Sequence, residues 1–196
     1  MKKLQLAFIS GQNVNHDKKV VAKKLDELFE ELKKFNEEII VMNGGHVGGF
    51  MSMISEKAKK NGFLTLGVLP IDFEKEFQKR KKFKDVYDNF SDIIINTTAG
   101  FGLRNEVLVR SADLVVLVNG GLGASGSFAE LTFAYHARKK IFVLEGTGGL
   151  ADKLKEIIKG HGTQGFLDIR KKVKVNFFET PKQLADEIKK ELKKFK

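Results

Sequence analysis

Apolar positions along the chain fall into short runs that are separated by amphipathic stretches. Runs of Val, Ile and Leu of this length are typical of strands buried on both faces of a sheet. Seven such strands are expected, at 4–9, 39–42, 63–69, 92–96, 113–118, 141–144 and 173–178.

Between these runs, apolar residues recur at spacings of three and four, the period of a helix that packs on one side. The first expected helix reaches about residue 35, and its apolar positions are Val21, Leu25, Leu28, Leu32 and Phe35. Further helices are expected around 51–58, after 100, after 127, over 150–159 and after 180. The last begins at Thr180-Pro181-Lys182-Gln183, which has the spacing of a capping box.

Strands that alternate with helices predict an α/β fold with a doubly wound, mostly parallel, Rossmann-like sheet of about seven strands and helices on both faces. No linker or repeat divides the chain, so 1–196 is expected to be a single nucleotide-binding domain. Residues 72–90 are the least regular part, because five aromatic residues interrupt a highly charged run. We interpret this segment as a helical lid or as an exposed connection, and it is a candidate for contacts between subunits.

Composition limits the classes of protein that remain. The absence of cysteine excludes disulfides and thiolate chemistry, and no apolar run approaches the roughly 18 residues of a membrane span. The start, Met-Lys-Lys, leads into an expected strand rather than a signal peptide, so a cytoplasmic protein without membrane contact is predicted. The net charge of +10 comes mostly from lysines on solvated helix faces, which makes nucleic acid an unlikely partner. Neither a metal nor a cofactor is expected.

Glycine-rich loops follow the expected second, fourth and fifth strands, at 43–49, 100–105 and 119–126. In parallel sheets the ligand lies at the carboxyl ends of the strands, so these loops are expected to converge on one site. Glycine lets main-chain N–H groups approach a phosphate at a helix N-terminus. The predicted phosphate contacts are Gly44, Gly45, Gly48, Gly120, Gly121, Gly123, Ser125, Gly126 and Ser127, with Ser10 and Gly11 after the first strand.

One interpretation of the central loop is a dinucleotide fingerprint. Gly121-Leu122-Gly123-Ala124-Ser125-Gly126 has the form G-x-G-x-x-G, and Glu145 ends the next strand, where an acid that binds ribose is expected. However, the fingerprint normally follows the first strand of its sheet, and here four strands precede it. A nicotinamide-dependent oxidoreductase is therefore a minor alternative.

A second interpretation includes the sequence before the loop. Gly123-Ala124-Ser125-Gly126-Ser127-Phe128-Ala129-Glu130 resembles the G-G-x-G-T-x-x-E motif of the LONELY GUY (LOG) family and of its relatives, which include molybdenum-cofactor carrier proteins. Arg104 lies nine residues before Asp113, the spacing that this family has. The stretch 43–51 is similar to the earlier G-G-G-x-x-G-L-M of the family, and the resemblance covers roughly residues 4–150.

The resemblance implies hydrolysis of the N-glycosidic bond of a nucleoside 5′-monophosphate, with a purine base favoured, in a homodimer or larger homo-oligomer. It implies that Glu130 stabilises positive charge at the ribose C1′ or activates water, and that Arg104 orients the nucleotide or holds Glu130 ionised. A carrier that binds a nucleotide or the molybdenum cofactor without turnover is the alternative, and the longer loop and Ser127 in place of threonine favour it.

Simpler interpretations of the same residues stay open. Ser127 and Glu130 also have the spacing of a capping box, and Arg104 fits a surface arginine early in a helix. His46, in the loop after the second strand, is expected to be a solvated side chain, with a ligand contact as the alternative.

Overall fold

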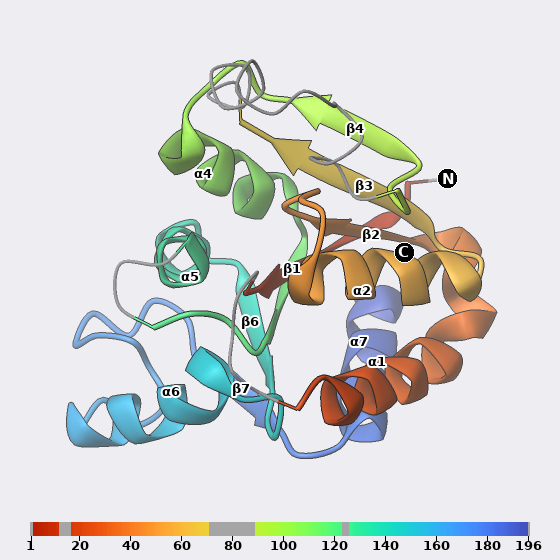
Figure 1. The fold of residues 1–196 in the computed structure, drawn as a ribbon. Helices are drawn as coiled ribbons and strands as arrows, with labels where there is room; N and C mark the ends of the chain where they lie inside the picture. Colours follow the sequence, from red (N-terminus) through yellow and green to blue (C-terminus); the bar gives the residue numbers. More distant parts are fainter. Residues whose placement is uncertain (1, 12–16, 71–88, 123–125, 196) are drawn as a thin grey trace.

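The computed structural model describes residues 2–11, 17–70, 89–122 and 126–195. Its centre is a seven-stranded sheet in which neighbouring strands pair in parallel, in the order β4-β3-β2-β1-β5-β6-β7 (Figure 1). The strands are β1 (Leu4–Ser10), β2 (Ile39–Asn43), β3 (Leu64–Leu69), β4 (Ile93–Asn96), β5 (Leu114–Val118), β6 (Lys140–Leu144) and β7 (Val175–Phe178).

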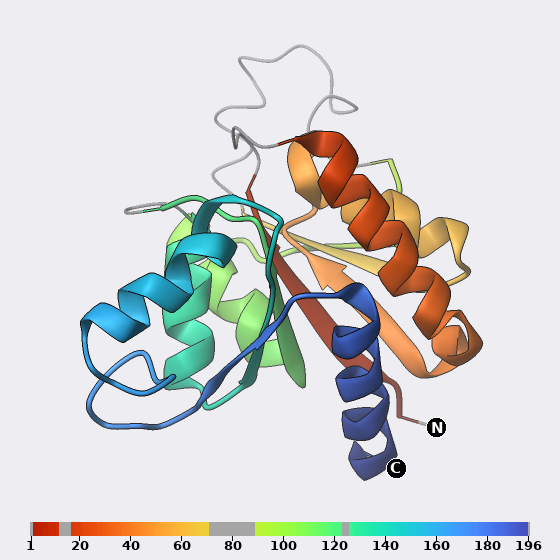
Figure 2. The same cartoon turned by 90° about the horizontal axis from the view of Figure 1, so that it is seen from below.

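Helices cover both faces of this sheet. Figure 2 shows α1, α2 and α7 on one side and α4, α5 and α6 on the other. Their bounds are α1 (Lys18–Leu32), α2 (Gly49–Lys60), α4 (Phe101–Ser111), α5 (Gly126–His136), α6 (Gly149–Gly160) and α7 (Pro181–Phe195), and a 3-10 helix η1 (Lys33–Glu38) follows α1. The predicted doubly wound α/β fold is confirmed.

The central strands follow the hydrophobic pattern of a sheet that is buried on both faces. Leu6 and Phe8 of β1 pack into the core under α1, α2 and α7, whereas Ala7 and Ile9 pack into the core under α4, α5 and α6. All five residues of β5 are buried in the same alternating way. This period of two is what a strand requires when helices cover both of its faces.

Strand ends differ from the prediction by at most two residues, and polar contacts explain two of these differences. The first helix, expected to reach about residue 35, ends at Leu32, and η1 continues from Lys33 to Glu38. Asp113 and Asp92 precede β5 and β4 because each carboxylate accepts hydrogen bonds from the start of a neighbouring strand, Gln5 N at 2.9 Å and Thr65 N at 3.0 Å respectively. The predicted capping box at α7 is present: Gln183 N donates to Thr180 Oγ1 at 3.2 Å, and Thr180 N donates to Gln183 Oε1 at 3.1 Å.

The sheet order sets the place of the ligand site. β1 and β5 are neighbours, yet the chain leaves β1 toward the α1 face and leaves β5 toward the α5 face (Figure 2). Such a switch point opens a crevice at the carboxyl ends of the strands. The predicted lid at 72–90 lies almost wholly outside the described residues. Among the helices that the structure describes, none is long and apolar enough to cross a membrane.

Candidate functional site at the carboxyl edge of the sheet

The site is centred on a buried ion pair between two adjacent helices. Arg104 Nη1, from the first turn of α4, donates to Glu130 Oε1, from the second turn of α5, at 2.9 Å. The two residues keep only 5% of their surfaces exposed. The structure thus brings together the two residues that the sequence predicts as catalytic.

Burial controls the charge of this pair. Loss of solvent raises the pKa of Glu130 from 4.5 to about 7, although the charge of Arg104 and its hydrogen bond oppose the shift. Burial also lowers the pKa of the Arg104 guanidinium, but an arginine stays protonated near neutral pH. Glu130 therefore exchanges a proton close to neutral pH, which suits a general acid or base.

The loop between β2 and α2 packs against the guanidinium. A Cβ on Gly44 would lie 2.8 Å from Arg104 Nη1 and 2.9 Å from Met51 Sδ, so any larger residue there would displace one or both of these side chains. Two rings extend the cluster: Arg104 Cζ lies 5.6 Å from the ring centroid of Phe101, and the ring of His46 stacks on Phe101 with 5.7 Å between centroids. The expectation of a solvated His46 is wrong, because its residue is only 7% exposed.

The end of β1 joins the same cluster. Ser127 donates its hydroxyl to the carbonyl oxygen of Ser10 at 3.0 Å, and Phe50 N donates to the carbonyl oxygen of Gly11 at 3.2 Å. Ser127 lies inside α5, where this contact ties the helix to β1, and Glu130 directs its carboxyl to Arg104. Neither contact is one that a capping box makes, although the spacing of Ser127 and Glu130 in the sequence also allows a capping box.

Several buried polar atoms at this edge lack a partner. Among the described residues, Ser10 Oγ, Arg104 Nε and Asn105 Oδ1 are buried and accept or donate no hydrogen bond. A buried polar atom without a partner is costly, so a group of them at one place calls for an explanation. A polar ligand or ordered water bound at the carboxyl edge of the sheet would provide the missing hydrogen-bond partners. Asn105 was not predicted, and its position directly after Arg104 is the only signal in the sequence.

The glycines of the two predicted phosphate loops have more than one role. In the loop after β2, Gly45 N donates to Asn43 Oδ1 and Gly48 N to Ser52 Oγ, each at 2.7 Å, so these amides serve the loop itself. Gly45 has φ +65°, and a Cβ there would lie 3.0 Å from Gly67 Cα on β3.

In the loop after β5, the carbonyl oxygen of Gly120 accepts from Leu150 N at 2.8 Å, so this glycine joins β5 to the start of α6. Gly126 begins α5, and a Cβ there would lie 3.6 Å from Asn105 Nδ2. Gly121 is the last glycine of this loop before residues 123–125, which the structure does not describe. The predicted contacts Gly123 and Ser125 therefore lie outside the described residues.

An acidic side chain of α6 itself occupies the N-terminus of this helix. The carboxylate of Asp152 accepts from Gly146 N at 2.7 Å, Gly148 N at 2.9 Å and Thr147 N at 3.3 Å.

Glu145, the acid of the dinucleotide interpretation, pairs with Lys155 at 3.1 Å. Within the described ranges, no three His, Asp or Glu side chains gather as metal ligands do.

Comparison with known proteins places this arrangement in a family. The family model described as SLOG cluster4 matches residues 9–176, which contain every strand of the sheet in whole or in part. The chain belongs to the SLOG cluster4 family. The expected relation to LOG-like and molybdenum-cofactor carrier proteins is confirmed at the level of family and fold.

Solved structures with the fold of this SLOG chain include proteins of different kinds. The protein TM1055 is 27% identical, with 97% of this chain and 99% of that one covered and a TM-score of 0.73. The molybdenum cofactor carrier protein from Chlamydomonas reinhardtii is 20% identical, with 98% and 99% covered and a TM-score of 0.69. DNA processing protein A from Helicobacter pylori, which binds single-stranded DNA, is 16% identical, with 97% and 82% covered and a TM-score of 0.60. No curated protein matches the sequence.

Proposed function

We propose that this SLOG protein binds a nucleoside 5′-monophosphate at the carboxyl edge of its sheet and hydrolyses the N-glycosidic bond. The products are the free base and ribose 5-phosphate, and a purine base is favoured. The observation that carries the proposal is the buried Arg104–Glu130 pair, which lies beside unsatisfied polar atoms at the switch point of the sheet.

Each residue has a role that its surroundings support. As the C1′–N bond breaks, positive charge develops at C1′, and the Glu130 carboxylate stabilises it or removes a proton from the attacking water. Arg104 holds Glu130 in place, and its Nε is left as a donor for the nucleotide. The proposed phosphate contacts at the start of α5 are main-chain amides, because the helix N-terminus favours an anion and the Ser127 hydroxyl already donates to the carbonyl oxygen of Ser10. Gly123 and Ser125 remain contacts predicted from the sequence.

The second candidate is a carrier that binds a nucleotide or the molybdenum cofactor without turnover. Its support is that the Glu130 carboxyl is already paired and is almost fully buried, as a purely structural group would be. The fold shared with a molybdenum cofactor carrier protein adds to it.

Incubation with AMP, GMP, CMP and UMP, followed by chromatography of the free base, separates the two candidates. We expect base release from a purine nucleotide, and a loss of about 10²- to 10⁴-fold in Glu130→Gln with nucleotide binding retained. Glu106→Gln is the matched control, because Glu106 forms an exposed pair with Arg110 on α4. Binding without base release from any nucleotide would assign the site to a carrier, and full turnover by Glu130→Gln would remove this residue from the mechanism.

A further inference from the structure

The last strand of the sheet has an open side. Among the strands that the structure describes, β7 pairs with β6 alone. The main-chain groups of Phe178 point toward β6, because the carbonyl oxygen of Phe178 accepts from Glu145 N at 2.9 Å. The main-chain groups of Val175 point away from β6, since its N–H donates to the carbonyl oxygen of Gly165 at 2.8 Å. Main-chain groups alternate in direction along a strand, so Phe177 also directs its N–H and C=O outward. The bridge between Phe166 and Lys174 covers the edge only at the beginning of β7.

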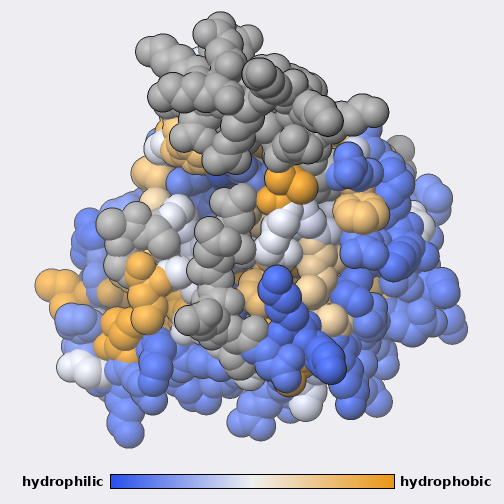
Figure 3. Space-filling model, in the orientation of Figure 1, coloured by the Kyte–Doolittle hydropathy of each residue, from blue (hydrophilic) through white to orange (hydrophobic). Residues whose placement is uncertain are grey.

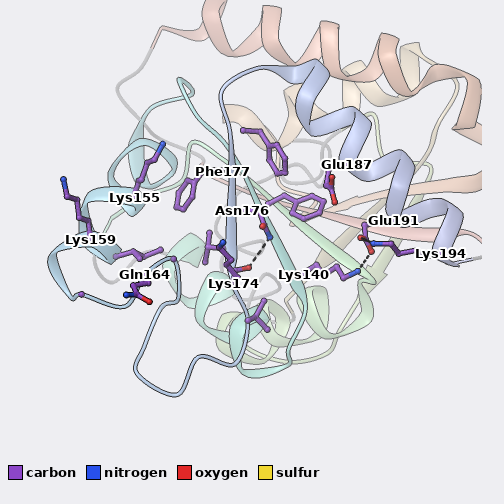
Figure 4. Close-up of a pocket in the computed structure, with 17 residues that line it drawn as sticks. Lys140, Lys155, Lys159, Gln164, Lys174, Asn176, Phe177, Glu187, Glu191 and Lys194 are labelled. Atoms are coloured by element: carbon purple, nitrogen blue, oxygen red, sulfur yellow. Dashed lines mark hydrogen bonds and ion pairs between the residues drawn. The ribbon is translucent and has the colours of Figure 1, made fainter.

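This edge forms the floor of a groove between α6 and α7. The groove has a volume of 1190 Å³, and all of its lining residues belong to the described part of the chain. In Figure 4, Lys155 and Lys159 line one side of the groove and Glu187, Glu191 and Lys194 the other, with Phe177 and Asn176 between them.

The charge of the groove is positive. Five lysines and two glutamates line it. Lys140 and Lys194 share Glu191, Lys155 pairs with Glu145, and Glu187 pairs with Lys190. Lys159 and Lys174 are exposed, and neither forms an ion pair with another described residue. Two cations without an acidic partner in the described part of the chain therefore line the same groove as this open stretch of main chain.

We propose that the groove along β7 binds an acidic peptide segment of a partner protein, which adds to the sheet as an extended strand. The outward N–H and C=O of Phe177 supply the main-chain hydrogen bonds, and Lys159 and Lys174 pair with acidic side chains of the peptide. Addition of a strand to an open edge combines main-chain hydrogen bonds with side-chain specificity in this way.

Other occupants fit the groove less well. Single-stranded nucleic acid binds through exposed aromatic faces as well as cations, but Phe177 and Phe178 pack against the two cores, and Lys155 lies over the ring of Phe177. A second copy in a symmetric contact would place like-charged lysines against each other.

Selection of displayed eight-residue peptides on the immobilised protein tests this proposal. We expect the enriched peptides to carry Asp or Glu at alternate positions. The strongest peptide, synthesised with a fluorescein label, is then titrated by fluorescence anisotropy. The double variant Lys159→Glu/Lys174→Glu should weaken its binding at least tenfold, and methylation of alternate amide nitrogens in the peptide should do the same without a change of charge.

The control is Lys23→Glu/Lys34→Glu, which changes the net charge equally at exposed positions on α1 and η1, outside the groove. Peptides that are not acidic, no enrichment of any peptide, or an equal loss in the control would overturn the proposal. A labelled 12-residue oligothymidylate is titrated in parallel. If it binds with the lysine dependence expected for the peptide, while no peptide is enriched, the groove belongs to nucleic acid instead.

Discussion

Gly44 is the residue at which one added methyl group would most directly disturb the candidate site. In Gly44→Ala, the new Cβ would meet Arg104 Nη1 at 2.8 Å and Met51 Sδ at 2.9 Å, so the guanidinium must move away from its present position. We expect a loss of about 1–3 kcal/mol in the free energy of unfolding, as for other overpacked sites, together with weaker nucleotide binding. Urea denaturation and a nucleotide titration measure the two effects.

Gly102→Ala is the matched control for this substitution. Gly102 lies inside α4, and a Cβ there would meet nothing within 4 Å. Because alanine is the better helix former, this variant should gain about 0.5–1 kcal/mol. Equal effects of the two substitutions would contradict the close packing of the loop on Arg104.

Glu130 should make the stability of the protein depend on pH. Its pKa in the folded state is about 7, above the ordinary value of 4.5. The folded chain therefore retains a proton that the unfolded chain releases between these values, and the free energy of unfolding falls as pH rises from about 4.5 to about 7. Urea denaturation at several pH values checks this expectation. Subtraction of the Glu130→Gln profile from the wild-type profile isolates the residue, and parallel profiles would contradict the expectation.

At the scale of single residues, the sequence predicted which side chains lie together at this edge of the sheet better than it predicted their contacts. The loop motif indicated Glu130, and the spacing of nine residues before Asp113 indicated Arg104, so both members of the ion pair were predicted. The surroundings of His46 and Asn105 depend on which helices lie side by side. His46 stacks on Phe101 of α4, and Asn105 lies beside Gly126 at the start of α5, so both neighbours come from distant segments. Such contacts follow from tertiary packing, which a local pattern does not contain.

Among the elements, α6 has a helix start that depends on one carboxylate. Asp152 accepts hydrogen bonds from three consecutive amides before the helix, Gly146 N, Thr147 N and Gly148 N. Asp152→Ala leaves these donors without the acceptor and removes a negative charge near the helix N-terminus, so we expect a loss of about 1–2 kcal/mol. Thermal denaturation measures the loss. Asp186→Ala, at an exposed position in α7, is the control, and a similar loss in both variants would contradict this role of Asp152.

Elements were the most predictable part of the molecule. Each expected strand is present. In the centre of the sheet, an apolar run of Val, Ile and Leu has few other ways to be buried between two layers of helices, whereas the isoleucines of the edge strand β4 stay exposed. Strand ends were less predictable. The expected last strand begins at Val173, but Lys174 pairs with Phe166 in an antiparallel bridge, and β7 begins at Val175. Nothing in the local sequence indicates that bridge.

For the whole molecule, we predict a homo-oligomer and expect the contact between subunits at β4. Figure 3 shows that hydrophilic residues dominate the right-hand and lower parts of the visible face, and that an apolar patch lies at its lower left, away from β4. Ile93, Ile94 and Ile95 are 43%, 38% and 43% exposed on the edge strand β4. An exposed apolar edge strand usually has a partner. Light scattering after gel filtration should show a dimer or larger assembly for the wild type and a monomer for Ile94→Lys.

The control for that experiment is Val20→Lys, which places a lysine at another exposed apolar position, on α1. A monomeric wild type, or the same mass for the wild type and Ile94→Lys, would contradict assembly through β4. The single-domain organisation of 1–196 likewise remains a prediction.

The pairing of β1 with β5 also determines when the site can form. Gln5 and Asp113, which hydrogen-bond where the two strands begin, are 108 residues apart in sequence, and the contact between Ser127 and Ser10 spans 117. Closure of such long loops is slow and follows local helix formation. During synthesis, β1 can therefore pair with β5 only after more than half of the chain has been made. In a refolding chain, we expect the ability to bind a nucleotide to be among the last properties to appear.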